Sequence, residues 1–341
     1  MIRPDLSGNT IAGKFRLLRR LGQGHFGDVY LGENTLVGRQ FALKIVPASE
    51  PNDDVSLEAK FLNISSHPNI VQIKSAEYWS DNLGKPYFLI EMEYVSGGNM
   101  QSMINKGCTI FDIVKLMKNV FFALDHAHPK LIHRDIKPAN ILLGGGGKLS
   151  DFGIAMLASS GLSPSTKFYN RNLAPECCGA SPSFSVASDI YAAGLTLLRG
   201  LNLISDWKAS LAAIPNWRAK MAAGALIQAL GFHTRVPVKL KKIVTKACAS
   251  DPKKRYSSAA AFRDALESLI ILRDWKSEAT DRWSCIHAGA REEIIIDSAN
   301  KTFRVQYFRN GRRKLAQCSD FLVYTEAERF AYHTISQSSL G

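Results

Sequence analysis

The first part of the chain alternates short apolar runs with turns that contain glycine. Three runs, FRLLRRLG, DVYLGEN and QFALKIV, lie between residues 15 and 46 and lack helical periodicity, which predicts an antiparallel β opening. In the third run Phe41, Leu43 and Ile45 fall on one face, so Lys44 falls on the other, because strand side chains alternate. Two later runs, HPNIVQI and PYFLIEMEYV, also predict strands.

A helical pattern takes over further along the chain. Residues 53–66 already have helical spacing, with Leu57, Phe61 and Ile64 on one side. After Gly98 four long segments predict helices: FDIVKLMKNVFFALDHAH, VASDIYAAGLTLLRGL, VPVKLKKIVTKACA and SAAAFRDALESLIIL. A β-rich front and an α-rich rear predict two lobes with a cleft between them.

The tail from about residue 275 changes character again. WSCIHA, EEIIID, TFRVQYF and KLAQCSDFLVY predict short strands, and TEAERFAYHTIS predicts a closing helix. The glycines at 144–147 predict a hairpin turn between ILL and KLS. We therefore expect an N-terminal extension (1–14), a two-lobed domain (15–272, divided near 95) and a small accessory domain (275–341).

Composition narrows the class of protein only slightly. With 341 residues, 46% of them apolar, the chain is expected to be globular, with one large and one small domain. No apolar run predicts a signal peptide or a membrane span, and the six cysteines have neither CxxC nor zinc spacing. We expect free thiols and a cytoplasmic location. The net charge of +13 fits acidic partners and nucleic acid equally well.

The segment LGQGHFGDVY contains glycines at 22, 24 and 27, a pattern that lets backbone approach phosphate oxygens. A dinucleotide-binding site needs a helix at Gly27, but DVYLGEN predicts a strand. A glycine loop that joins two strands, here with Gly22, Gly24 and Gly27, is the arrangement found in protein kinases. In this feature the chain resembles the eukaryotic-type (Hanks-type) serine/threonine protein kinase family. The resemblance implies an α+β, bilobal protein-kinase-like fold with a β-rich N-lobe and an α-helical C-lobe.

The same resemblance implies an ATP site. Lys44 in FALK matches the lysine that holds the α- and β-phosphates, and Glu58 matches the helix glutamate that pairs with it. Their plain alternatives are an exposed strand lysine and a solvated helix carboxylate. The adenine site is implied to consist of Leu21, Val29, Ala42 and Leu142, with Met92 as gatekeeper and Glu93 to Val95 as hinge. Each apolar residue among them is equally compatible with a plain core.

HRDIKPAN, residues 133–140, is the strongest motif. The resemblance makes Asp135 the catalytic base and Lys137 a cation for the transferring phosphoryl group. It makes Asn140, and Asp151 in DFG, the ligands of Mg²⁺, with Mn²⁺ as an alternative.

Further matches imply structural and regulatory roles. Glu176 in APE would pair with Arg255 in DPKKRYS, and Asp189 in SDIYAAG would brace the catalytic loop. Arg134 would meet a phosphate on the activation segment. The favoured phosphosite is Thr166 and the second is Ser165; the alternative is that these hydroxyls only solubilise a loop.

The sequence also departs from the family pattern and leaves rivals open. FYNRNLAPE places Tyr169 where a threonine is usual, so the Ser, Thr or Tyr preference is less firmly predicted than catalysis. A pseudokinase-like scaffold or regulatory binding protein would have lost a chemical residue, and a small-molecule phosphotransferase would not need APE and Arg255. A nucleic-acid module in the tail is disfavoured, since residues 273–341 hold 11 Lys and Arg against 9 Asp and Glu. We expect protein substrates, autophosphorylation, partner docking through 275–341 and no membrane.

Overall fold

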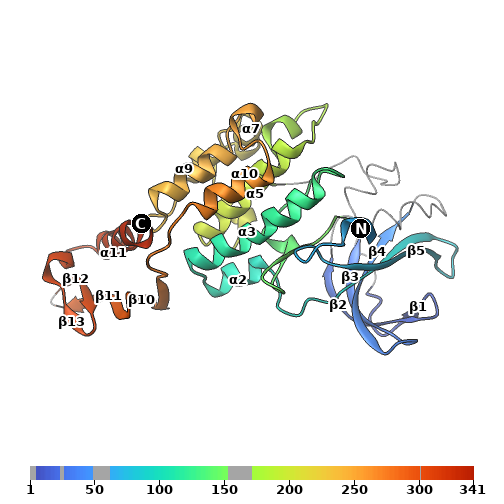
Figure 1. Cartoon of the computed structure of the whole chain (residues 1–341), viewed down its shortest axis with the longest axis horizontal. Helices are drawn as coiled ribbons and strands as arrows, with labels where there is room; N and C mark the ends of the chain where they lie inside the picture. The colour runs from blue at the N-terminus through green and yellow to red at the C-terminus, as the bar shows by residue number, and fades with distance from the viewer. Residues whose placement is uncertain (1–4, 24–26, 49–61, 153–170, 300) are drawn as a thin grey trace. The chain divides into compact units, whose positions relative to one another are not determined.

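The computed structural model describes residues 5–23, 27–48, 62–152, 171–299 and 301–341 (Figure 1). Within these ranges no helix has both the length and the apolarity that crossing a membrane requires. The chain divides into two compact units. The first comprises Met1–Gly98, Phe122–Asp135 and Asn140–Arg171, and the second comprises Asn99–Phe121, Ile136–Ala139 and Asn172–Gly341.

The first unit is built on a six-stranded antiparallel sheet, in the order β1-β2-β3-β4-β6-β5. Its strands are β1 (Thr10–Ile11), β2 (Phe15–Gln23), β3 (Asp28–Asn34), β4 (Arg39–Pro47), β5 (Ile73–Ser80) and β6 (Pro86–Met92). Phe41, Leu43 and Ile45 point together into a buried cluster with Phe15 and Tyr30. The predicted β opening and its apolar face are therefore confirmed.

The strand prediction for HPNIVQI was wrong in its bounds. Ile70 forms only a single bridge, with Leu149, and β5 begins at Ile73. The late start follows from a different pairing, because the Val71 amide donates to the Leu149 carbonyl at 3.0 Å and so bonds to the strand that contains Leu149 rather than to β6. Most of the helix predicted at 53–66 lies outside the described residues.

The first unit also contains the short hairpin of β7 (Ile141–Leu142) and β8 (Lys148–Leu149). Its turn is closed by the Gly147 amide, which donates to the Gly144 carbonyl at 2.9 Å, as the glycine run predicted. The Leu149 amide donates to the Asn69 carbonyl at 2.8 Å and so joins the hairpin to the segment before β5.

The second unit contains the helices that follow residue 99. They are α2 (Met100–Lys106), α3 (Ile110–Ala127, which continues into the first unit), α5 (Val186–Leu201), α6 (Trp207–Ala212), α7 (Trp217–Ala222), α8 (Leu226–Leu230), α9 (Val238–Ala247) and α10 (Ala259–Glu267). The 3-10 turns are η1 (Pro138–Asn140) before β7, η2 (Pro175–Cys177) before α5 and η3 (Pro252–Lys254) between α9 and α10. The predicted helices α3, α5 and α9 are confirmed, and α10 ends earlier than predicted, at Glu267. α5 is buried along most of its length, as expected for a central helix.

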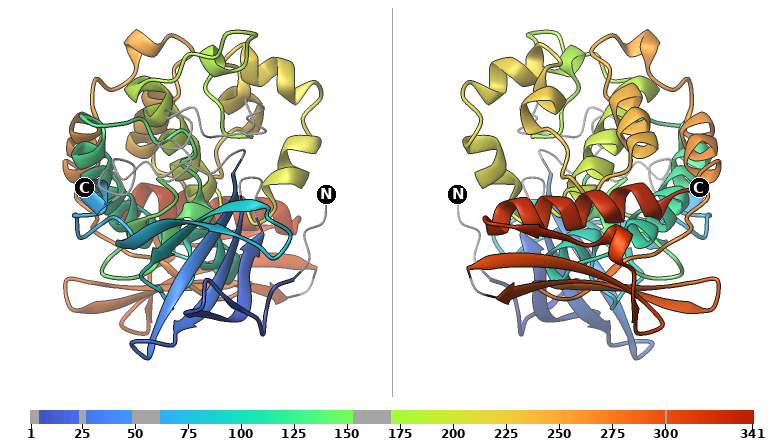
Figure 2. Two further views of the ribbon diagram at one scale, coloured as in Figure 1. Left: turned by 90° about the vertical axis from the view of Figure 1, so that its right-hand side faces the viewer. Right: turned by 90° about the vertical axis from the view of Figure 1, so that its left-hand side faces the viewer.

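The tail of the second unit forms a separate sheet. Its elements are β9 (Lys276–Ala279), β10 (Arg282–His287), β11 (Ala290–Ala299), β12 (Thr302–Arg309), β13 (Arg312–Arg313), η4 (Leu315–Gln317), β14 (Ser319–Phe321) and the helix α11 (Tyr324–Ser339). The strand order is β13-β12-β11-β10-β9, and β14 pairs with β12. Figure 2 shows α11 lying across one face of this sheet, where Ala327, Ala331 and Ile335 pack on Trp283 and Ile294.

The strand prediction for KLAQCSDFLVY was largely wrong. This segment forms η4 and the three-residue β14 instead. Leu315 and Leu322 are 73% and 78% exposed, so the apolar positions that suggested a strand do not enter the core. The segment also contains one Lys, one Ala and one Asp, residue types that strands disfavour.

The C-terminal end of the tail is hydrogen-bonded to the segments that flank α9 and α10. The amides of Leu272 and Arg273 both donate to the Ser339 carbonyl, at 2.8 and 3.3 Å. The Ser336 hydroxyl donates to the Val236 carbonyl at 3.1 Å. These contacts place α11 against the start of α9, within the same compact unit. An independently folding domain at 275–341 remains a prediction.

Candidate active site

The loop before η1 is held by a buried histidine. The Nδ1 atom of His133 accepts from the Asp135 amide at 3.2 Å, so the Nε2 atom carries the hydrogen and donates to the Ser150 carbonyl at 2.9 Å. The ring also meets the edge of Phe152, with centroids 4.6 Å apart. One imidazole therefore ties the loop at 133–135 to the segment that carries Asp151.

Asp135 and Asn140 form a buried polar pair. The Asn140 side-chain amide donates to the Asp135 carbonyl at 2.8 Å and to its Oδ2 at 3.0 Å. The Asn140 carbonyl in turn accepts from the amide and the hydroxyl of Ser150, at 2.8 and 3.0 Å. This arrangement fixes the Asp135 carboxylate and leaves Oδ1 as the acceptor end of Asn140.

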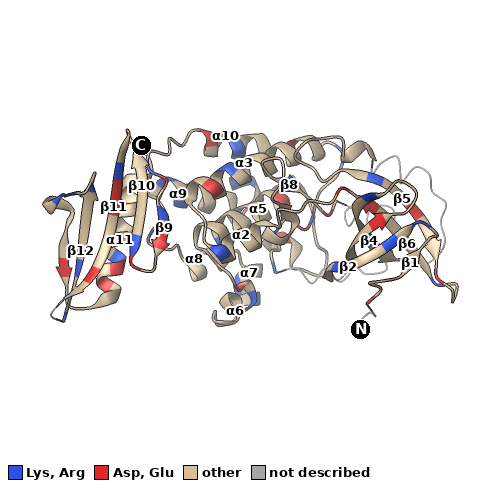
Figure 3. Ribbon diagram, turned by 90° about the horizontal axis from the view of Figure 1, so that it is seen from below, with Lys and Arg blue, Asp and Glu red and all other residues tan. Residues whose placement is uncertain are grey.

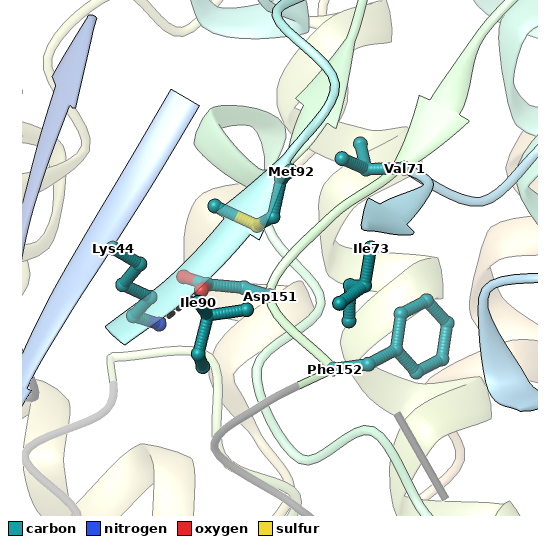
Figure 4. Close-up of a pocket in the computed structure, with 7 residues that line it drawn as sticks. All are labelled: Lys44, Val71, Ile73, Ile90, Met92, Asp151 and Phe152. Atoms are coloured by element: carbon teal, nitrogen blue, oxygen red, sulfur yellow. Dashed lines mark hydrogen bonds and ion pairs between the residues drawn. The ribbon is translucent and has the colours of Figure 1, made fainter. Parts of the chain in front are cut away.

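Lys44 and Asp151 form the second polar pair, drawn as a dashed line in Figure 4. Lys44 is only 4% exposed, on β4 opposite Val29, and Asp151 follows β8 directly. Pairing is what a buried ammonium requires, because an isolated charge is costly away from water. The two residues lie at one end of an apolar pocket that is lined by Lys44, Val71, Ile73, Ile90, Met92, Asp151 and Phe152.

Two site residues have strained backbones. Arg134 has φ 67° and Asp151 has φ 74°, both in the left-handed region that residues with a side chain rarely adopt. Each such conformation costs about 1–3 kcal/mol and persists only where the surroundings enforce it. Asp151 belongs to one polar pair and Arg134 directly precedes a member of the other, and strain of this kind is typical of a functional site.

Most residues predicted for the adenine site lie on strands of the six-stranded sheet, and Leu142 lies on β7 of the separate hairpin. Ala42 pairs with Met92 in register, and Val29 pairs with Lys44. Ala42 is buried, whereas Leu21, Val29, Met92 and Leu142 are half-buried.

Some of the hydrogen-bonding groups in the segment after β6 already have partners. The Glu93 amide donates to the Gln72 carbonyl at 2.9 Å, and its carboxylate accepts from Lys148 and from the Gln72 amide. Across the described ranges, the Glu93 carbonyl and the Val95 amide have no hydrogen-bond partner. Both groups are therefore available to a ligand.

The glycine segment is described in part. Gly22 pairs with Val29 in register. A Cβ at Gly27 would lie 2.4 Å from the Ile45 carbonyl oxygen, so this position requires glycine for packing alone. The predicted site residues Gly24, Glu58, Ser165 and Thr166, and also Tyr169, lie outside the described residues.

In the second unit, Glu176 and Arg255 are brought together. The guanidinium Nη1 and Nη2 atoms of Arg255 lie 2.6 and 2.8 Å from the two carboxylate oxygens of Glu176, a bidentate pair. Arg255 also donates to the Ala187 carbonyl at 2.8 Å, at the start of α5. Asp189, in the first turn of α5, is 1% exposed, and Lys137 is half-buried.

Two residues that hold the loop before η1 were not among those predicted from the sequence. The Asn172 side-chain amide and the Thr196 hydroxyl both donate to the Ile136 carbonyl, at 3.1 and 3.4 Å. Thr196 is fully buried in α5, but Ser188, Asp189 and Arg199 are buried polar residues of the same helix, so its position gave no distinct signal. Asn172 gave no local signal.

Comparisons with known proteins agree with this geometry. The family model described as "Protein kinase domain" matches residues 15–267. The serine/threonine-protein kinase PknJ of Mycobacterium bovis is 33% identical over 303 residues, which cover 82% of this chain and 48% of that protein. PrkC of Bacillus subtilis, also a serine/threonine-protein kinase, is 32% identical over 270 residues, which cover 74% of this chain and 40% of that protein.

A solved structure is similar as well. The PknI kinase domain of Mycobacterium tuberculosis gives a TM-score of 0.52 at 25% identity, covering 78% of this chain and 99% of that one. The chain spans less than half the length of the curated relatives named above.

Proposed function

Since this chain belongs to the protein kinase family, we propose that it transfers the γ-phosphoryl group of ATP to Ser and Thr hydroxyls of proteins, itself included. The supporting observation is the pair of polar contacts in one compact unit, Asn140 with Asp135 and Lys44 with Asp151. They supply an acceptor for a proton, oxygen ligands and a buried cation. A protein kinase needs these groups because it catalyses by positioning and by charge stabilisation.

The residues fit a divalent cation. The Asp151 carboxylate and the Asn140 Oδ1 atom are hard oxygen donors of the kind that Mg²⁺ prefers, and Mn²⁺ accepts the same set. The hydrogen bonds from the Asn140 amide to Asp135 orient its oxygen end away from that residue. When bound, such an ion neutralises charge on the nucleotide phosphates.

Asp135 is proposed as the base. The substrate oxygen attacks the γ-phosphorus, the bond to the β-phosphate oxygen breaks, and the hydroxyl proton passes to the Asp135 carboxylate. Asn140 holds that carboxylate in place, and Lys137 balances the charge of the transferring group. Lys44 holds the α- and β-phosphates, which replace Asp151 as partners of its ammonium.

The adenine ring is proposed to lie among Leu21, Val29, Ala42 and Leu142, with Met92 beside it. The Glu93 carbonyl and the Val95 amide are an acceptor and a donor suited to the polar edge of the base. This follows from their unengaged hydrogen-bonding capacity among the described residues.

Regulation and location remain parts of the same proposal. A phosphate on Thr166, or as second choice on Ser165, would meet Arg134 and order the activation segment. Partner docking is assigned to 275–341. A cytoplasmic location is supported by six cysteines that are all free thiols.

The test is incubation of the full chain with γ-labelled ATP and Mg²⁺, followed by mapping of phosphosites on the protein and on an added protein substrate. The matched variant is Asp135→Asn, which keeps the shape and one acceptor oxygen of the side chain. We expect label on Ser and Thr in the wild type and almost none with the variant. Nucleotide binding without transfer in the wild type would favour the pseudokinase alternative.

A further inference from the structure

Six lysines gather on α9 and the adjoining turn η3. They are Lys239, Lys241, Lys242, Lys246, Lys253 and Lys254, and we call this surface the lysine face. All are exposed except Lys241, which is half-buried. The only acidic residue between 238 and 254 is Asp251, whose carboxylate already accepts from the Lys253 amide at 2.9 Å. Figure 3 shows the basic residues of α9 in blue.

These lysines differ from other surface cations of the chain. Arg291 pairs with Glu278 at 2.9 Å, and Arg304 pairs with Asp320 at 2.8 Å, both on the tail sheet. None of the six lysines forms an ion pair with an Asp or Glu in the part of the chain that the structure describes. The charge of the lysine face is therefore not balanced by those residues.

The arrangement is unfavourable for the helix itself. Lys242 and Lys246 stand four residues apart, a spacing at which like charges repel. Lys239 and Lys241 occupy the first turn, which contains no acidic residue and where the helix dipole disfavours cations. Lys246, in contrast, stands in the last turn, where the dipole favours a cation, and its Nζ atom lies 4.4 Å from the centre of the Tyr256 ring. Lys239 donates to the Gly341 carbonyl. Neither contact supplies an Asp or Glu carboxylate, so the counter-charge of the lysine face is to be sought in another molecule.

The shape and residue types favour one kind of counter-charge. Lys239, Lys242 and Lys246 follow one side of α9 over about 10 Å, at 1.5 Å per residue. The stretch 238–254 contains no aromatic residue for base stacking and no arginine. Its exposed large apolar residue is Val238 alone, too little for insertion into a membrane surface. Each lysine is a point charge on a flexible stem, so successive ammonium groups can meet separate carboxylates of an extended acidic run without a fixed geometry.

We propose that the lysine face binds an Asp/Glu-rich segment of the protein that is phosphorylated, at a distance in sequence from the acceptor hydroxyl. The proposal rests on the proposed kinase function and names a substrate class for it. Docking would raise the effective concentration of the acceptor at the catalytic residues. Because the charges are exposed, the gain should weaken as ionic strength rises.

The test compares two peptide substrates with one acceptor sequence. One of them carries in addition a flexible Gly-rich linker and an Asp/Glu-rich tract. For the wild type we expect KM to be about tenfold lower with the tract and kcat to be unchanged. Lys242→Glu with Lys246→Glu should abolish this difference while leaving kcat and KM for the short peptide unaltered.

The control variant is Lys115→Glu with Lys208→Glu, which reverses two exposed lysines on α3 and α6 and changes the net charge equally. It should keep the KM difference. Thermal unfolding of both variants checks that they are folded. An equal KM for the two peptides in the wild type, or an equal loss in both variants, would overturn the proposal.

Binding is also measured without phosphoryl transfer, with a labelled tract peptide that has no hydroxyl residue, by fluorescence anisotropy. Binding that Lys242→Glu with Lys246→Glu removes supports the lysine face even if no peptide is phosphorylated, an outcome that would count against the kinase function alone. Short duplex DNA and phosphatidylserine vesicles serve as competing probes. If either binds through these lysines and the tract peptide does not, the proposal is wrong.

Discussion

Arg273, just beyond α10, pairs with Glu292, a carboxylate in the middle of the tail sheet that is only 1% exposed. The Arg273 Nη2 atom lies 3.3 Å from Oε1, and the Tyr307 hydroxyl donates to the other carboxylate oxygen. Burial raises the pKa of Glu292, but the hydrogen bonds from Arg273 and Tyr307 leave it below its ordinary value. The link between the helices and the tail sheet is therefore a charged one.

Arg273→Met should lower the free energy of unfolding by about 3 kcal/mol at pH 7, because it leaves buried Glu292 with only the longer of its two arginine contacts, that to Arg309 at 3.7 Å. The contribution of the pair is present above the unfolded pKa of about 4.5 and is lost as pH falls through the lower folded value. Urea unfolding at a pH above and a pH below these pKa values measures the contribution of the pair. Adding Glu292→Gln to Arg273→Met should restore part of the loss; no recovery would contradict the electrostatic explanation.

Lys44→Ala should cut phosphoryl transfer by about 10² or more, because the phosphates lose their buried cation and are misplaced. Steady-state assays at saturating ATP measure the effect. Lys74→Ala is the control, since Lys74 is an exposed lysine on β5 of the same sheet. Equal activity of the two variants would mean that another cation holds the phosphates.

A stacked histidine pair predicts a pH dependence of stability. The rings of His67 and His126 lie 5.0 Å apart at 28°, and Lys130 Nζ lies 3.4 Å from His126 Nε2 and 2.6 Å from Asn63 Oδ1. Burial first, and His126 second, lower the pKa of His67 below 6.5. The unfolded chain thus binds more protons here, so stability is full above this pH and falls below it.

Thermal unfolding followed from about pH 7.5 to about 5.5 should report this loss. His126→Gln removes the neighbouring imidazole and should make the decline of the melting temperature shallower. A slope that does not change with this variant would assign the pH dependence to other groups.

The strands at 15–46 and the helices α3, α5 and α9 could be predicted because each has a local hydrophobic period that packing does not override. HPNIVQI was misjudged because its apolar residues before Ile73 face the core with no strand pairing, within the described ranges, except the bridge at Ile70. In the site, the motif order identified Asp135 and Asn140 as candidates. The motif order could not reveal that the Asn140 side chain donates to the Asp135 carboxylate. Nor could it reveal that Lys44 pairs with Asp151, which is 107 residues away.

Removal of the tail after residue 274 should leave a folded kinase domain of lower stability. The helices keep their own buried core, but they lose the contacts of Val236 and Arg273 with the tail. We expect a melting temperature lower by several degrees and retained transfer activity. An insoluble or inactive fragment 1–274 would show that the tail is integral to the domain.

The hydrogen bonds at Ser339 have a mechanical consequence. The Ser339 carbonyl accepts from the amides of Leu272 and Arg273. In addition, Leu340 forms a bridge with Ile271, and the Gly341 amide donates to the Ile270 carbonyl at 2.9 Å. The segment from 274 to 338 is thus a loop closed by a clasp of backbone hydrogen bonds. When the chain is pulled from both ends, tension passes through this clasp, and the tail sheet and α11 bear no load until it opens.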